Sequence, residues 1–165
     1  MDNWDFIACD DQHDINTENL TKLRDYMRDV VLKNNRPFDM TTYMSISNDD
    51  SNDVVVEQLK QFENDVHGCK TSACLLGYAP LALNKPITVL IGEDLPSDMD
   101  DFYSEFLLRQ FGIFDMTQLW DFLFGPVWSN DVQCAIDRLT YVIENKASPN
   151  YCFVTGEFEE FSYGK

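Results

Sequence analysis

The stretch VHGCKTSACLLGYAPLAL, residues 66–83, is the longest low-charge run in a chain of 165 residues that is otherwise rich in acid. It contains one histidine and two cysteines, a composition that suits either a metal or thiol site or a buried core segment. From about Thr71 to Ala79, or a little beyond, it is compact and apolar enough to form a buried helix. Pro80 and Pro86 are expected to bracket the exit of this helix, because proline disfavours a continuing helix. We therefore expect the other helices to pack around this segment.

A metal site in this stretch would use His67, Cys69 and Cys74. Zinc sites usually contain closely spaced cysteine pairs and a fourth ligand, and four intervening residues are at the edge of that pattern. On a continuous helix, two residues five apart point about 140° away from each other, so both sulfurs could not face one ion. We favour buried thiols and a hydrogen-bonded histidine, and we predict neither a metal nor a cofactor.

A catalytic thiol would need a cysteine of low pKa beside a base, and His67 is the only histidine near the two cysteines of the stretch. The chain has no C-x-x-C pair, Walker loop, G-x-S-x-G elbow or H-E-x-x-H helix. Its five cysteines are irregularly spaced and do not indicate a disulfide framework. We expect that the protein is not an enzyme, and a small thiol- or metal-dependent enzyme is the least favoured alternative.

Length and composition predict a single domain over residues 1–165, with 44% hydrophobic residues to form a core. The expected fold class is mainly α, with one or two short strands or a terminal hairpin, although α+β stays open. An acidic segment at 1–15 and an aromatic and acidic tail at 150–165 flank the helical part. Apolar spacing and capping residues predict helices over about 17–33, 54–65, 98–112, 116–125 and 129–146.

Local signals refine these elements. Asn16 or Thr17 is expected to cap the first helix, and Ser129 or Asn130 the last. Residues 38–47 and 87–92 are rich in β-branched side chains and could be short strands. The tail is expected to form a hairpin or an ordered extension around Gly156. The inward face of the last helix should contain Val132, Ala135, Ile136, Leu139, Val142 and Ile143.

The segment CKTSACLLGYA, residues 69–79, resembles the C-G-T-x-A-C-x-x-G-[WH]-A signature of a loosely defined group of small, mostly uncharacterised proteins of bacteriophages and bacteria. LTKLRDYM, FDMTTY, FGIFDMTQLWDFLFGPVW and DVQCAIDRLTYVI match other segments of that group in the same order, so the resemblance covers about residues 18–146. Lys70 stands where the group usually has glycine. The resemblance implies a helical fold and a phage or bacterial setting, and it implies no particular activity.

Charge is the most unusual property of the chain. The 29 acidic and 12 basic residues give a net charge of −17, which makes nucleic acid and anionic membrane surfaces poor partners. The sequence contains no apolar run of about 20 residues and no signal-peptide pattern, so we expect a soluble protein of the cytoplasm, in the phage setting that of the host cell. A basic protein is the natural complement, and a homodimer stays open.

The acid is clustered: residues 1–21 and 86–108 each contain six carboxylates and no lysine or arginine. A net charge of −17 corresponds to roughly 29 Å of duplex DNA, close to the dimensions of a domain of this size. We therefore expect an acidic phage protein that imitates DNA and inhibits a DNA-binding or defence protein of the host, for example a restriction-type component. The expected binding residues are Asp49, Asp50, Asp53, Glu93, Asp94, Asp98, Asp100, Asp101, Glu105, Glu157, Glu159 and Glu160.

The alternative is a host-takeover or regulatory adaptor that binds its partner through an apolar patch. Its anchors would be exposed aromatic side chains near the termini, although packing of these side chains on the core is the favoured interpretation. The candidates are Trp4, Tyr151, Phe153, Phe158 and Phe161.

Overall fold

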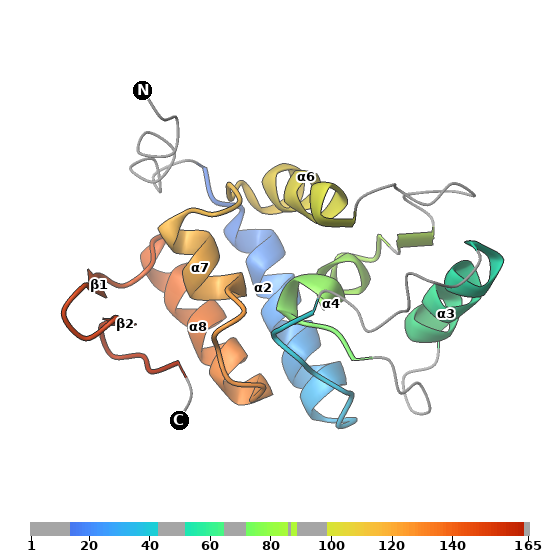
Figure 1. The fold of residues 1–165 in the computed structure, drawn as a ribbon, viewed down its shortest axis with the longest axis horizontal. Coiled ribbons are helices and arrows are strands. Elements are labelled where there is room, and N and C mark those ends of the chain that lie inside the picture. The colour runs from blue at the N-terminus through green and yellow to red at the C-terminus, as the bar shows by residue number, and fades with distance from the viewer. Residues whose placement is uncertain (1–13, 43–51, 65–71, 86, 89–98, 164–165) are drawn as a thin grey trace.

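The computed structural model describes residues 14–42, 52–64, 72–85, 87–88 and 99–163. These residues form a mainly helical fold with one small antiparallel sheet, which confirms the predicted fold class (Figure 1). The elements are α2 (Thr17–Tyr26), η1 (Met27–Leu32), α3 (Asn52–Asn64), α4 (Leu75–Ala82), α6 (Met99–Phe111), α7 (Gln118–Phe124), α8 (Val132–Asn145), β1 (Tyr151–Cys152) and β2 (Glu157–Phe158).

Helix α2 and its continuation η1, a π-helical segment, form the central rod of the fold. The side-chain oxygen of Asn16 accepts a hydrogen bond from the backbone N–H of Asn19 at 3.0 Å and caps α2, as predicted. The apolar stripe of the rod is completely buried. It packs against α8 and α4, so the rod lies between these two helices (Figure 1). The stripe consists of Leu20, Leu23, Met27 and Val31.

Helix α4 is the buried helix expected in the opening stretch, but its limits differ from the prediction. It begins at Leu75, and Cys74 lies outside it as the N-cap residue. It then continues through Pro80 to Ala82. All residues from Leu75 to Pro80 are buried, so packing keeps the chain helical where proline removes one backbone N–H. The N–H of Lys85 donates to the Pro80 carbonyl at 2.8 Å and closes the last turn.

The segment 38–42 lies beside the residues that precede α4. Phe38 and Ala73 form an isolated parallel bridge, and the N–H of Cys74 donates to the Thr42 carbonyl at 2.9 Å. Within the described residues the strand expected over 38–47 is therefore reduced to a single bridge, and 43–47 lie outside them. In the second expected strand, Ile87 and Thr88 are helical and 89–92 lie outside the described residues.

Helices α6, α7 and α8 follow the prediction closely. Gly112, with a φ of +70°, ends α6, and α7 ends at Phe124 before Gly125. The N-cap of α8 is Asp131, not Ser129 or Asn130, because the Asp131 side chain accepts from the Gln133 N–H at 3.0 Å. Asn130 has another role: its side-chain oxygen accepts from the Met40 N–H at 2.8 Å and ties segment 38–42 to α8.

The tail forms the predicted hairpin, in which Tyr151 pairs with Phe158 and Cys152 with Glu157. An aromatic cluster fixes this hairpin to α7 and α8. Phe122 of α7 is the centre of the cluster, with no exposed surface, and its ring contacts four other rings at centroid distances of 4.9–5.9 Å. The four rings belong to Trp128, Tyr141, Phe158 and Phe161.

Both charged side chains that are buried in the described part of the chain are arginines, and neither contacts a carboxylate. The guanidinium of Arg36 lies 4.8 Å from the ring centre of Phe62 and donates to the Phe62 carbonyl at 2.7 Å. That of Arg138 lies 4.4 Å from the ring centre of Trp128, and its Nε and one terminal nitrogen have no hydrogen-bond partner. Aromatic faces therefore provide much of the compensation for removing these cations from water.

Replacement of Arg138 by methionine is expected to leave the free energy of unfolding unchanged or to raise it by up to about 3 kcal/mol. Burial lowers the pKa of Arg138 to about 10, so the side chain is charged at pH 7 in a site that opposes charge. This penalty is present in full below about pH 10 and is lost as the pH rises above it. Methionine fills much of the same space without a charge.

Urea unfolding at pH 7 measures this effect, with Arg138→Ala as the control. The alanine variant removes the same charge but leaves a cavity beside Trp128, so it should be less stable than the methionine variant. A loss of more than about 1 kcal/mol in Arg138→Met would show that the guanidinium is a net stabilising group.

Candidate protein-binding surface

Cys74 is the cysteine of residues 66–83 that the structure describes, and it has a structural role. Its Sγ accepts a hydrogen bond from the N–H of Gly77 at 3.4 Å and caps α4. The side chain is 3% exposed, and this burial raises the pKa of the Cys74 thiol to about 11. Such a thiol is protonated at neutral pH and is a poor nucleophile. His67 and Cys69 lie outside the described residues.

Under native conditions at pH 8, Cys74 is expected to resist thiol reagents, while Cys152 reacts first. Only about 0.1% of Cys74 would be ionised at this pH, and the side chain is covered by the fold. Hydrogen bonds from Thr155 and from the backbone of the turn lower the pKa of Cys152, and this side chain is partly exposed. Maleimide labelling followed by peptide mass spectrometry measures both rates, with urea-unfolded protein as the control. Equal labelling of the two thiols in the native protein would contradict the buried position of Cys74.

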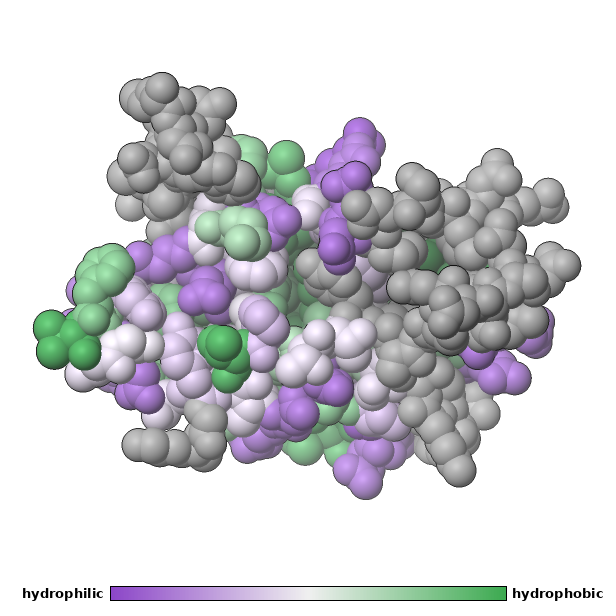
Figure 2. Space-filling view, in the orientation of Figure 1, coloured by the Kyte–Doolittle hydropathy of each residue, from purple (hydrophilic) through white to green (hydrophobic). Residues whose placement is uncertain are grey.

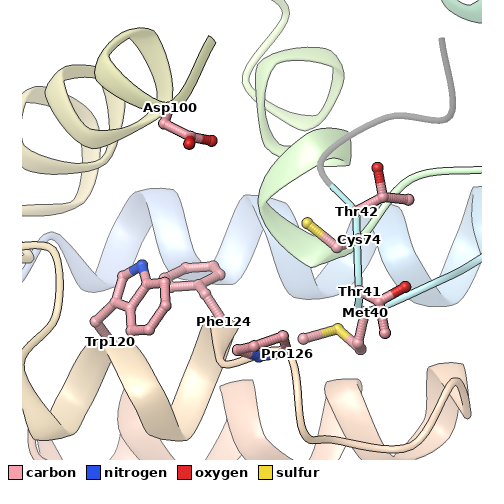
Figure 3. Close-up of a pocket in the computed structure, with 8 residues that line it drawn as sticks. All are labelled: Met40, Thr41, Thr42, Cys74, Asp100, Trp120, Phe124 and Pro126. Atoms are coloured by element: carbon pink, nitrogen blue, oxygen red, sulfur yellow. The ribbon is translucent and has the colours of Figure 1, made fainter. Parts of the chain in front are cut away.

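A cavity of about 310 Å³ lies beside this thiol (Figure 3). Trp120 and Phe124 of α7 form one wall, and Asp100 of α6 lies across from the Cys74 sulfur. The remaining lining residues are Met40, Thr41, Thr42 and Pro126. The eight described lining residues include a protonated thiol and one carboxylate, and none of these eight supplies an imidazole or an amine to activate them. Polar and apolar residues contribute equally to the described lining of this hollow, and these residues by themselves do not form a complete catalytic arrangement.

The predicted acidic binding residues divide into four groups. Asp100, Asp101 and Glu105 are exposed on α6. Glu105 forms an ion pair with Arg109 at 2.5 Å, so its charge is partly neutralised. The hairpin presents Glu159 and Glu160 to solvent and Glu157 partly so. Asp53 belongs to α3, and the remaining five lie outside the described residues: Asp49, Asp50, Glu93, Asp94 and Asp98.

The structure adds carboxylates that the sequence analysis missed. Asp137 and Glu144 lie seven residues apart on the exposed side of α8, opposite its buried face, and Asp131 lies at its N-terminus. This spacing is a recognisable sequence signal, because residues seven apart share a helix face. The distribution of charge along the chain does not reveal it, because the helix brings together residues that are distant in sequence.

Residues 111–163, here called the C-terminal acidic region, contain eight carboxylates and two bases. One of the bases, Arg138, is fully buried, so Lys146 is the only exposed base of this region. No ion pair within the described chain involves any of the eight carboxylates. They are Asp115, Asp121, Asp131, Asp137, Glu144, Glu157, Glu159 and Glu160.

The rod formed by α2 and η1 has a different electrostatic character. Its bases alternate with carboxylates and form ion pairs with them, including Lys22 with Glu18 at 3.5 Å and Arg28 with Asp29 at 2.9 Å. Arg24 and Arg28 also both contact Asp25 at 3.3 Å. Acid is therefore paired on the rod and unpaired in the C-terminal acidic region.

The aromatic anchor candidates differ in their exposure to solvent. Phe158 is 3% exposed, and Tyr151 and Phe161 are partly buried in the aromatic cluster, so these three pack on the core as the favoured interpretation predicts. Phe153 is 89% exposed at the hairpin turn, next to Val154 at 95%. Trp4 lies outside the described residues. Of the four described anchor candidates, Phe153 is therefore the one that is strongly exposed.

Comparison of the chain with protein-family models, curated proteins and solved structures gives no significant match. Across the described helices, none combines the length and the apolar character needed to cross a bilayer. In the same residues, no three histidine, cysteine or acidic side chains are grouped as metal ligands would be. The charge and the exposed apolar residues of the surface are therefore the features that bear on function.

Proposed function

We propose that this protein binds a basic, nucleic-acid-binding protein and inhibits it by occupying the site that DNA would occupy, without catalysing a reaction. The observation that carries the proposal is the C-terminal acidic region: none of its eight carboxylates forms an ion pair within the described chain, five of them are exposed, and the region has a single exposed base. Unpaired carboxylates are available to lysine and arginine side chains of a partner, whereas those on the rod already have partners.

The spacing of the carboxylates supports this proposal. Asp137 and Glu144 on α8 are about 10 Å apart along the helix axis, given a rise of 1.5 Å per residue. Two exposed carboxylates on one helix face hold negative charge at a defined separation. A DNA-binding site built to neutralise several phosphates would therefore meet several carboxylates at once.

The resemblance of the signature segment suggests the setting: a phage protein acting in the cytoplasm of a bacterial host on a DNA-binding or defence protein, such as a restriction component. Direct binding to nucleic acid or to a membrane does not belong to this proposal, because both surfaces are anionic. A homodimer would double the number of acidic regions and is compatible with the mechanism.

Displacement from DNA tests the proposal directly. A bacterial extract is bound to DNA–cellulose at about 50 mM salt, and the purified protein is then added in increasing amounts. We expect it to release a basic protein in a saturable manner at this salt concentration, and we expect the released protein to dissociate from the immobilised chain at about 0.5 M salt. Retention on the immobilised chain that is unchanged at about 0.5 M salt, or no saturable release from DNA at any concentration, would refute the proposal.

Two variants with equal charge change provide the matched control. Asp137→Asn, Glu144→Gln and Glu160→Gln together remove three unpaired carboxylates from the C-terminal acidic region. Glu18→Gln, Asp25→Asn and Asp29→Asn remove three paired ones from the rod. We expect the first triple variant to need about 10-fold more protein for release and the second to behave as the unaltered chain. Equal effects would indicate a nonspecific polyanion and not a defined binding surface.

A further inference from the structure

The turn of the C-terminal hairpin exposes two adjacent apolar side chains, Phe153 and Val154, which are 89% and 95% exposed. Other large apolar residues that reach solvent in the described chain are less exposed, the next being Met116 at 63%. In the space-filling view the pair forms an apolar projection at the hairpin end of the molecule (Figure 2). Exposure of two large neighbouring apolar side chains is unfavourable in water, so it invites a functional explanation.

The projection is held in a defined conformation. The hairpin is closed by a hydrogen bond from the Gly156 N–H to the Cys152 carbonyl at 2.8 Å, with Gly156 at a φ of +72°. Below the turn, the ring of Tyr151 contacts those of Phe153 and Phe158 at 5.1 and 5.2 Å. Phe158 is itself buried in the aromatic cluster. Little conformational freedom is therefore lost when Phe153 contacts a partner, which favours tight binding.

Negative charge surrounds the projection. Residues 147–163 contain Glu157, Glu159 and Glu160 and no base. A second copy of this chain would bring the same carboxylates together, so charge opposes pairing of two hairpins. An anionic lipid surface is opposed for the same reason. The chemistry fits a protein surface on which lysine and arginine residues border an apolar pocket.

We propose that the Phe153–Val154 turn is the anchor that inserts into an apolar pocket of the basic partner, while the flanking glutamates contact the basic rim of that pocket. This inference rests on the proposed function, because the proposed function assigns a basic partner to the C-terminal acidic region. The carboxylates accelerate association and set its salt dependence, and the apolar pair slows dissociation and supplies specificity.

The first test compares tip and charge variants in release from DNA–cellulose. The double variant Phe153→Ser, Val154→Ser should raise the protein concentration needed for half-maximal release by about 30-fold, a loss of affinity typical of a binding hot spot. The salt dependence of that concentration should stay unchanged. Glu157→Gln, Glu159→Gln and Glu160→Gln together should mainly reduce the salt dependence. All these positions are exposed or partly exposed, and circular dichroism should show that the fold is intact.

The second test does not depend on DNA. Phe153→p-benzoylphenylalanine places a photoreactive aromatic group at the tip in living bacterial cells, and Leu32→p-benzoylphenylalanine, at a 41% exposed position of η1, is the control. We expect a discrete protein adduct from position 153 alone, with the cross-linked peptide lying among lysine and arginine residues and apolar side chains. No adduct, the same adducts from both positions, or sedimentation of the chain with phospholipid vesicles through Phe153 would overturn the inference.

The two tests separate the two proposals. If the unaltered chain and the tip variant release the partner from DNA equally well, the anchor proposal is refuted and the proposed function is retained. A discrete adduct at position 153 together with no release from DNA refutes competition with DNA. It supports an adaptor that binds its partner through the apolar tip. Failure of both tests removes both proposals.

Discussion

Phe122→Ala is expected to lower the free energy of unfolding by about 3–5 kcal/mol, a large fraction of the stability of a domain of this size. Phe122 is fully buried, and its ring contacts Trp128, Tyr141, Phe158 and Phe161. Alanine would leave a cavity where α7, α8 and the hairpin meet. Because Phe158 and Phe161 belong to the tail, the hairpin should also lose protection against proteolysis.

Urea unfolding monitored by tryptophan fluorescence and circular dichroism measures the change. Phe153→Ala is the matched control, since it makes the same chemical replacement at an 89% exposed position and should change stability by less than about 0.5 kcal/mol. A loss below about 1 kcal/mol for Phe122→Ala would mean that the cluster does not hold the hairpin in place.

Gly112→Ala is expected to destabilise the protein by about 3 kcal/mol, for two reasons that add. The backbone at Gly112 has a φ of +70°, a conformation that side chains with a Cβ rarely adopt. A Cβ at this position would also lie 2.4 Å from the Asp14 carbonyl oxygen, so the chain entering α2 would have to shift. That shift would weaken the hydrogen bond of 2.9 Å from the Asn16 N–H to the Phe111 carbonyl.

Gly156→Ala separates the two contributions. Gly156 has nearly the same φ of +72°, but an added Cβ would meet nothing closer than the Tyr151 hydroxyl at 3.8 Å. It should therefore lose only the conformational part, about 1 kcal/mol. The midpoint of thermal unfolding should fall clearly further for Gly112→Ala than for Gly156→Ala. Equal shifts would show that the junction of α6 and α2 yields without strain.

The sequence predicts those elements whose signals are local. Apolar spacing locates the rod, and glycine locates the ends of α6 and α7, because both signals depend on residues within one or two turns. Pro80 wrongly predicts the end of α4, because tertiary packing outweighs the lost backbone hydrogen bond and the helix continues to Ala82. The cap of α8 shifts by one residue because Asn130 is used instead by the distant N–H of Met40.

The candidate surface is only partly visible in the sequence. An excess of acid is evident from composition, but ion pairing decides which carboxylates are available. Pairing depends on helix faces: Glu105 forms an ion pair with Arg109, whereas Asp137 and Glu144 form none within the described chain. The tail likewise contains several aromatic residues of similar local context. Strand register buries Phe158 and exposes Phe153, and long-range packing fixes that register.

The buried Arg138 gives the acidic exterior a second role. The described exterior carries more carboxylates than bases, and the carboxylates of Asp131 and Asp137 favour the charged form of this buried guanidinium. A negative potential at the surface lowers the free-energy cost of keeping a charged guanidinium in the interior. Neutralising the surface, by mutation or by acidification, would weaken this support while it relieves repulsion among the carboxylates. The same carboxylates would then serve both recognition and internal electrostatic balance.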